Sequence, residues 1–209
     1  IDLVRCWLVH TIAKYDDIKS WNFLDQAPLN HSGSGSELLG KAAIAEPLYF
    51  IEQFLPVFVE TVLKTAVINR DLVLNRAWPY LRNSSDPHDV NDSIFFQIRQ
   101  ALESFAKVDV KMFRRFAEPL KRYHHESFGY LLLMSYAANP MEFADECVQY
   151  MCDHRPRLNI GYGVWSGGGH GESAVSREAI KAVTPLCSEE MIRRLEDSVI
   201  DYCDAYEQE

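Results

Sequence analysis

The sequence predicts an all-α protein in which antiparallel helix pairs form a solenoid-like stack of the HEAT or TPR type. Apolar residues recur at three- and four-residue steps along most of the 209 residues, which is the period of a helix packed on one side. The joints between successive helical segments are short, and short joints force neighbouring helices to pack antiparallel. A hydrophobic content of 47%, with 12% aromatic residues, supplies enough apolar surface for a core.

The amino-terminal part divides into two helices and a linker. Residues 1–29 are expected to hold one helix from Asp2 to Tyr15 and another from Ile18 to Asp25. Residues 30–40 are expected to be a flexible Gly/Ser linker or loop, because the Asn, His, Ser and Gly run at residues 30–36 offers nothing apolar to bury. The helical-repeat domain then occupies residues 41–209.

Within this domain the periodicity predicts one long helix followed by shorter ones. The long helix, from Glu46 to Asn69, is apolar on more than one side, and Pro56 is expected to kink it. Asn139 and Pro140 form a helix start signal, a cap residue followed by proline at the first helical position. The other expected helices cover residues 72–81, 90–107, 110–123, 128–138, 141–154, 176–183 and 188–206.

The bulk chemistry argues against general binding to nucleic acid or membrane. A formal net charge of −9 gives an acidic surface that repels phosphate and anionic lipid. No apolar run reaches the roughly 18 residues that a membrane span needs.

The five cysteines are an odd number at spacings that match no disulfide framework, which predicts a reducing, cytoplasmic setting. Because the chain opens on Ile1 inside a helical pattern, we expect a piece cut from a longer polypeptide.

One expected helix is basic in this acidic chain. Lys111, Arg114, Arg115 and Arg122 share one helical face, and Glu118 is the acid among them. The residues left for packing on the other side are Met112, Phe113, Phe116 and Leu120. A solvated face paired with acidic neighbours is one interpretation. A docking strip for an acidic protein partner is the other, and nucleic acid could bind only through this helix. The four cations are therefore candidate partner-binding residues.

A glycine-rich loop is expected at residues 161–173. Its glycine run at 166–171 is not a phosphate-binding P-loop, because Glu172 stands near the position where that motif needs lysine. One interpretation is a mobile surface loop between helices. The other is partner contact through Tyr162 and Trp165, since exposed aromatic side chains often anchor interfaces.

A catalytic or metal site finds little support in local motifs. His124, His125 and Glu126 are consecutive, and an enzyme site built from them and the 166–171 glycine run is an alternative that requires convergence on one cleft. No complete zinc ligand set emerges, so neither a metal nor another cofactor is expected. Catalytic triads can assemble from residues that lie far apart in the sequence, so this conclusion covers local motifs alone.

Five segments of residues 139–206 carry a resemblance, and they are Asn139 to Glu146, Tyr150 to His154, Arg157 to Tyr162, Ser176 to Ile180 and Cys187 to Glu190. Through them these residues resemble the helical-repeat region of large bacterial STAND (NACHT-like) ATPases. In that family an α-solenoid senses an invader's protein, a separate ATPase domain oligomerises, and an effector domain acts. The resemblance implies a sensor or scaffold without its own catalysis, and it transfers no functional residue.

These observations predict a non-catalytic protein-recognition or scaffold segment of a larger intracellular protein, and the resemblance implies the sensor part of a bacterial antiviral STAND ATPase. Oligomerisation through the parent protein is compatible with this prediction. The enzyme domain and a passive helical spacer remain the alternatives.

Overall fold

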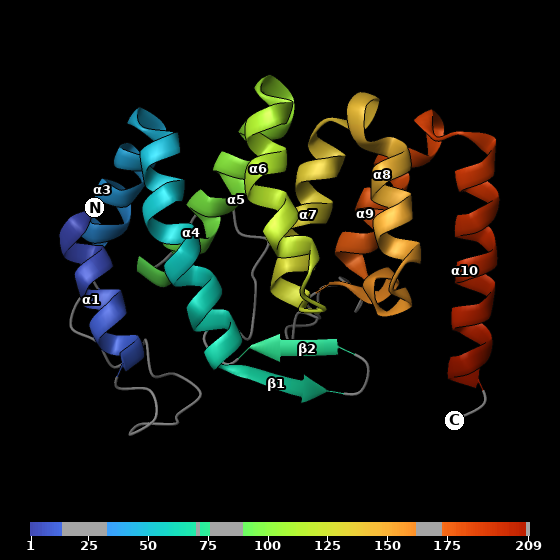
Figure 1. Cartoon of the computed structure of the whole chain (residues 1–209), viewed down its shortest axis with the longest axis horizontal. Coiled ribbons are helices and arrows are strands. Elements are labelled where there is room, and N and C mark those ends of the chain that lie inside the picture. Colours follow the sequence, from blue (N-terminus) through green and yellow to red (C-terminus); the bar gives the residue numbers. More distant parts are fainter. Residues whose placement is uncertain (14–32, 70–71, 76–89, 162–172, 208–209) are drawn as a thin grey trace. The chain divides into compact units, whose positions relative to one another are not determined.

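The computed structural model describes residues 1–13, 33–69, 72–75, 90–161 and 173–207. Nine α-helices account for most of these residues, which confirms the all-α prediction in its general form (Figure 1). Two short strands, β1 and β2, pair with each other. The elements are α1 (Asp2–Ala13), α3 (Gly33–Ala45), α4 (Pro47–Lys64), β1 (Ala66–Asn69), β2 (Leu72–Asn75), α5 (Val90–Val108), α6 (Val110–Lys121), α7 (Glu126–Ala138), α8 (Pro140–Cys152), the 3-10 helix η1 (Arg155–Asn159), α9 (Ala174–Val183), the 3-10 helix η2 (Thr184–Leu186) and α10 (Glu189–Glu207).

The chain forms two compact units. The amino-terminal unit comprises Ile1–Asn69 and Val73–Ala101, and the carboxy-terminal unit comprises Arg70–Leu72 and Leu102–Glu209. The division therefore falls within α5, whereas the sequence suggested a boundary at the linker of residues 30–40.

In the amino-terminal unit, α4 packs against α1 and α3. Its apolar side is buried and rich in phenylalanine, with the rings of Phe50 and Phe54 4.6 Å apart and those of Phe58 and Phe95 5.5 Å apart. Pro56 lies inside α4 on its exposed side. This helix is central in its unit, as expected, but it ends at Lys64 because the chain continues into strand β1.

Two sequence predictions in this unit are wrong. Residues 33–40 of the expected linker belong to α3, where Leu39 is buried and the Ser36 carbonyl accepts a hydrogen bond from Ser93 Oγ at 3.2 Å. Tertiary packing of this kind outweighs the low helix propensity of glycine and serine. The expected helix over residues 72–81 begins as strand β2, whose Leu-Val-Leu run suits a β-ladder equally well.

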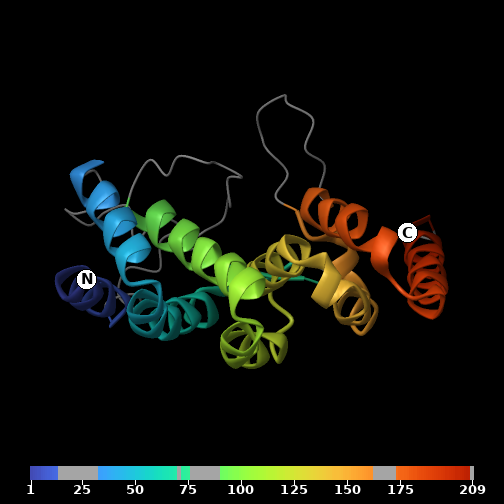
Figure 2. The same cartoon turned by 90° about the horizontal axis from the view of Figure 1, so that it is seen from above.

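The core of the carboxy-terminal unit lies around α7, which is buried along most of its length. Helix α7 packs against α6, α8 and α9, and α8 packs against α9 and α10 (Figure 2). Gly129 permits close approach of η1 to α7, because a Cβ atom there would lie 2.3 Å from Ile160 Cδ1. Ser176 Oγ then ties η1 to α9 by donating to the Arg157 carbonyl at 2.8 Å and accepting from Ile160 N at 2.9 Å.

Candidate functional site

Helix α6 presents a buried side and a charged side. Asp109 starts the helix, since its carboxylate accepts a hydrogen bond from Met112 N at 2.9 Å. The buried side matches the sequence expectation except that Met112 is only partly buried, and it fixes how the helix is rotated. It consists of Phe113, Phe116, Ala117 and Leu120.

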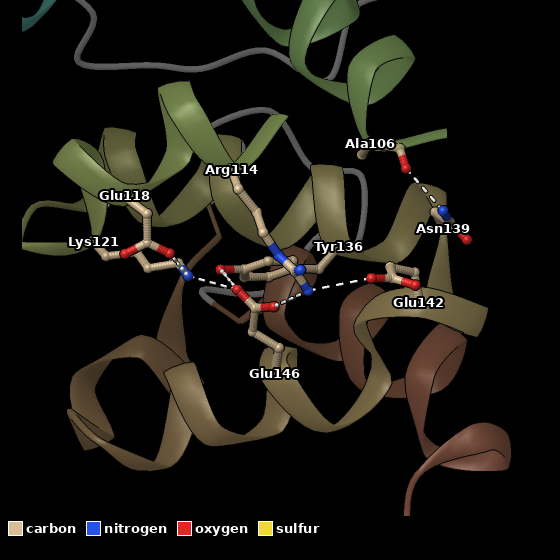
Figure 3. Close-up of polar contacts among 8 residues, drawn as sticks. All are labelled: Ala106, Arg114, Glu118, Lys121, Tyr136, Asn139, Glu142 and Glu146. Atoms are coloured by element: carbon tan, nitrogen blue, oxygen red, sulfur yellow. Dashed lines mark hydrogen bonds and ion pairs between the residues drawn. The ribbon is translucent and has the colours of Figure 1, made fainter. Parts of the chain in front are cut away.

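The basic residues of α6 separate into two groups. Arg114 and Lys121 lie on the side that faces α8, which we call the α8-facing side (Figure 3). Lys111, Arg115 and Arg122 are exposed opposite the buried residues, and we call them the outer face. The four cations that the sequence placed on one face therefore do not share one environment, because Arg114 has acidic neighbours from another helix.

Glu146 of α8 is the centre of the α8-facing side. Its carboxylate binds Lys121 Nζ at 2.5 Å and Arg114 Nη2 at 3.2 Å (Figure 3). Arg114 also reaches Glu142 at 3.2 Å, and Lys121 also reaches Glu118 at 2.6 Å. The Tyr136 hydroxyl donates to Glu146 at 3.4 Å. These contacts join α6, α7 and α8 through a single half-buried carboxylate.

The charged groups of this network shift one another's pKa values. Partial burial favours the neutral form of Glu146, but Lys121 and Arg114 outweigh it and hold the pKa of Glu146 below its usual value. Burial likewise opposes the charge of Lys121, yet the Glu118 and Glu146 carboxylates raise its pKa. Burial, reinforced by the charge of Glu146, raises the pKa of Tyr136. All three groups therefore keep their ordinary neutral-pH forms, and the network suits structural support rather than proton transfer.

Two cations of the outer face differ from those of the α8-facing side. Lys111 and Arg122 form no ion pair with any residue that the structure describes. The Arg115 guanidinium is exposed and lies 5.2 Å from the centroid of the Phe116 ring. Glu118 lies beside these cations, but its charge is matched by Lys121. Lys111 and Arg122 are therefore exposed positive charges in an acidic chain.

The structure separates the neighbouring residues of the alternative enzyme site. His125 caps α7 through Nδ1, which accepts a hydrogen bond from Ser127 N at 3.1 Å, and Glu126 is buried in the first turn. The His124 ring instead lies 4.0 Å from the His154 ring. The glycine run at 166–171 lies outside the described residues, so its convergence with these side chains stays a prediction. Among the described residues, no group of three or more His, Cys, Asp or Glu side chains could hold a metal ion.

Arg157 is a structural residue that the sequence did not single out. Its buried guanidinium lies 3.8 Å from the Tyr150 ring centroid and donates to the carbonyls of Tyr150 at 2.7 Å and Lys121 at 3.2 Å. It thus satisfies backbone groups near the carboxyl ends of α8 and α6. Nη2 also lies 3.3 Å from His124 Nδ1, which must accept because a guanidinium has no acceptor.

Two predicted partner-binding residues cannot be placed. Tyr162 and Trp165 lie outside the described residues, so their role as aromatic anchors stays a prediction.

Glu142 and Glu146, which sequence reasoning did not select, are four residues apart and so share a face of α8. That spacing is the one local signal that could have identified them.

No protein-family model matches the chain, and neither a curated protein nor a solved structure matches it significantly. Within the described ranges, no helix is both long and apolar enough to cross a membrane. Evidence on function therefore comes from the residues themselves.

Proposed function

We propose that the chain is a non-catalytic protein-recognition or scaffold segment of a larger cytoplasmic protein, and that it binds an acidic protein partner through the outer face of α6. The observation that carries the proposal is the division of cations on this helix. Arg114 and Lys121 are committed to carboxylates of the same chain, whereas Lys111 and Arg122 have no acidic partner among the described residues. Exposed positive charge in a chain of net charge −9 favours acidic partners at this surface.

The packing of the carboxy-terminal unit supports a solenoid-like arrangement of the HEAT or TPR type. Helix α7 packs against both α8 and α9, and α8 packs against both α9 and α10. Contact with the next helix and the next but one is what stacked helix pairs produce. Such stacks offer extended surfaces for binding proteins without a deep pocket.

The narrower proposal is that this segment is the sensor part of a bacterial antiviral STAND ATPase. It rests on the resemblance of residues 139–206 alone. In that case the parent protein contains an ATPase domain whose activity responds to the partner, and loss of partner binding at α6 abolishes that response.

Charge reversal on the outer face tests the main proposal. The variant Lys111→Glu/Arg122→Glu is compared with Arg177→Glu/Lys181→Glu, which reverses two exposed cations on α9. Each is expressed in the parent protein in its native cells, and bound proteins are captured by cross-linking and identified. We expect the first variant to lose a protein that the wild type and the control both retain. Equal recovery by all three would contradict the proposal and favour the passive spacer.

A further inference from the structure

Helix α1 presents an exposed side that points away from α4. The helix packs against α4, and its Leu8 is fully buried. At 3.6 residues per turn, the side opposite Leu8 holds four exposed residues, which are Leu3, Cys6, His10 and Ala13. The charged residues of the helix, Asp2 and Arg5, stand at other positions. This side of α1 is therefore neutral in a chain of net charge −9.

Cys6 and His10 have the chemistry and the spacing of a metal chelate. They are four residues apart, which makes them neighbours on the helix surface with about 5–6 Å between their Cβ atoms. Cys6 is a free, exposed thiol, and neither side chain forms a hydrogen bond or an ion pair with a described residue. Thiolate and imidazole are zinc ligands, and two ligands at positions i and i+4 are how one helix holds this ion.

One chain supplies only part of such a site. A structural zinc ion takes four ligands in a tetrahedron. Asp2 lies one turn before Cys6, but its carboxylate accepts a hydrogen bond from the Tyr49 hydroxyl at 3.2 Å. Among the described residues of one chain, no group of three or more His, Cys, Asp or Glu side chains could hold a metal ion. A second copy of the chain offers the two ligands that are missing.

The spacing of the exposed side suits an antiparallel contact between two copies of α1. The exposed positions 3, 6, 10 and 13 are separated by steps of three, four and three residues, and this order is the same in both directions. Around a two-fold axis, Cys6 of one copy therefore faces His10 of the second copy. Leu3, which is 75% exposed, faces the small side chain of Ala13 of the second copy. Two thiols and two imidazoles then surround the axis, as a tetrahedral ion requires.

We infer that Cys6 and His10 from two copies of this chain bind one zinc ion and join the copies through α1. Each Cys6 thiol releases its proton to solvent and binds as a thiolate, and each His10 imidazole binds in its neutral form. The two thiolates balance the two charges of the ion, so the site adds no net charge between two acidic chains. The inference goes beyond the proposed function and does not rest on it, because it involves another helix and no acidic partner.

A zinc titration of the reduced, metal-free 209-residue chain tests the inference. By sedimentation velocity we expect a monomer without metal and a dimer with zinc, complete at one zinc ion per two chains. With cobalt(II) in place of zinc we expect the visible absorption of a tetrahedral ion that has thiolate ligands. A mass that does not respond to zinc, or binding of one ion to each monomer, overturns the inference.

Single substitutions identify the ligands. Cys6→Ser and His10→Ala each remove two of the four ligands of the dimer, and we expect each to abolish zinc-dependent dimerisation. Cys6→His supplies another zinc ligand, so we expect it to keep the dimer while the cobalt(II) form loses its thiolate absorption. The matched control is Cys187→Ser, which removes a partly exposed free thiol of the carboxy-terminal unit and is expected to dimerise like the wild type.

The controls separate the zinc site from folding and from the proposed function. Circular dichroism and the thermal midpoint establish that the variants are folded. Zinc-dependent dimerisation that survives Cys6→Ser or His10→Ala, or that is lost in Cys187→Ser, overturns the inference. If the chain binds no zinc but Lys111→Glu/Arg122→Glu still loses a captured partner, the proposed function stands and the zinc site fails.

Discussion

The two charged sides of α6 carry the same residue types in different surroundings. On the α8-facing side, Arg114 and Lys121 have carboxylates within 3.2 Å from a helix more than twenty residues further along the chain. On the outer face, Lys111 and Arg122 have no such partner among the described residues. Charge on a helix therefore indicates neither stability nor binding until its neighbours are known. The first pair joins α6 to α8, and the second pair is the one that the proposed function assigns to an acidic partner.

The largest expected effect concerns the carboxyl end of α6, which Arg157 ties to the carboxyl end of α8. Arg157→Leu leaves the buried carbonyls of Tyr150 and Lys121 without their donor. We expect the free energy of unfolding to fall by about 2–4 kcal/mol, measured by urea denaturation. Arg155→Leu is the matched control, because Arg155 is half-exposed and pairs with Asp201 in solvent, and we expect it to cost less than about 1 kcal/mol. Equal losses would mean that Arg157 does not anchor α6.

The second effect separates the two carboxylates that share Lys121. Glu146→Gln removes the charge that joins α6 and α8, and we expect it to lower the free energy of unfolding by about 1–2 kcal/mol. Glu118→Gln removes only an exposed pair within one helix, and we expect a loss below about 0.5 kcal/mol. If Glu118→Gln proved the more costly, the lysine would belong to the outer face, and the comparison between the two sides would fail.

The pH dependence of stability sharpens the same distinction. Because Lys121 and Arg114 lower the pKa of Glu146 in the folded state, its stabilisation is complete above the ordinary glutamate value and is lost as the pH falls through the folded value. The difference in unfolding free energy between the wild type and Glu146→Gln should therefore shrink as the pH falls below the ordinary glutamate pKa of about 4.3. Denaturation curves at several pH values measure this difference. A difference independent of pH would assign the effect to packing rather than to charge.

The sequence predicted the helices of the carboxy-terminal unit well, because their apolar periodicity and start signals are local. It also predicted which side of α6 is buried. It could not assign Arg114 and Arg122 to different environments, since that depends on where Glu146 lies after folding. The same limit applies to Arg157, which is buried while Arg155, two residues away, is exposed. The Gly/Ser run in α3 was misjudged because its helix is stabilised by packing against α4 and by a hydrogen bond from Ser93 of α5 rather than by its own composition.

The smallest expected effect on folding belongs to the outer face. Lys111→Ala and Arg122→Ala remove exposed charges that have no acidic partner in the described part of the chain, so we expect changes within about 0.5 kcal/mol in the free energy of unfolding. Arg114→Ala should cost more, about 0.5–1 kcal/mol, because it contacts both Glu142 and Glu146. Thermal and urea denaturation of the three variants measure the order. If these alanine variants keep the stability of the wild type while charge reversal at the same residues abolishes capture of the protein partner, the cations serve binding rather than folding. If Lys111→Ala instead destabilised the chain as much as Arg114→Ala, the outer face would be structural and the case for a docking surface would be lost.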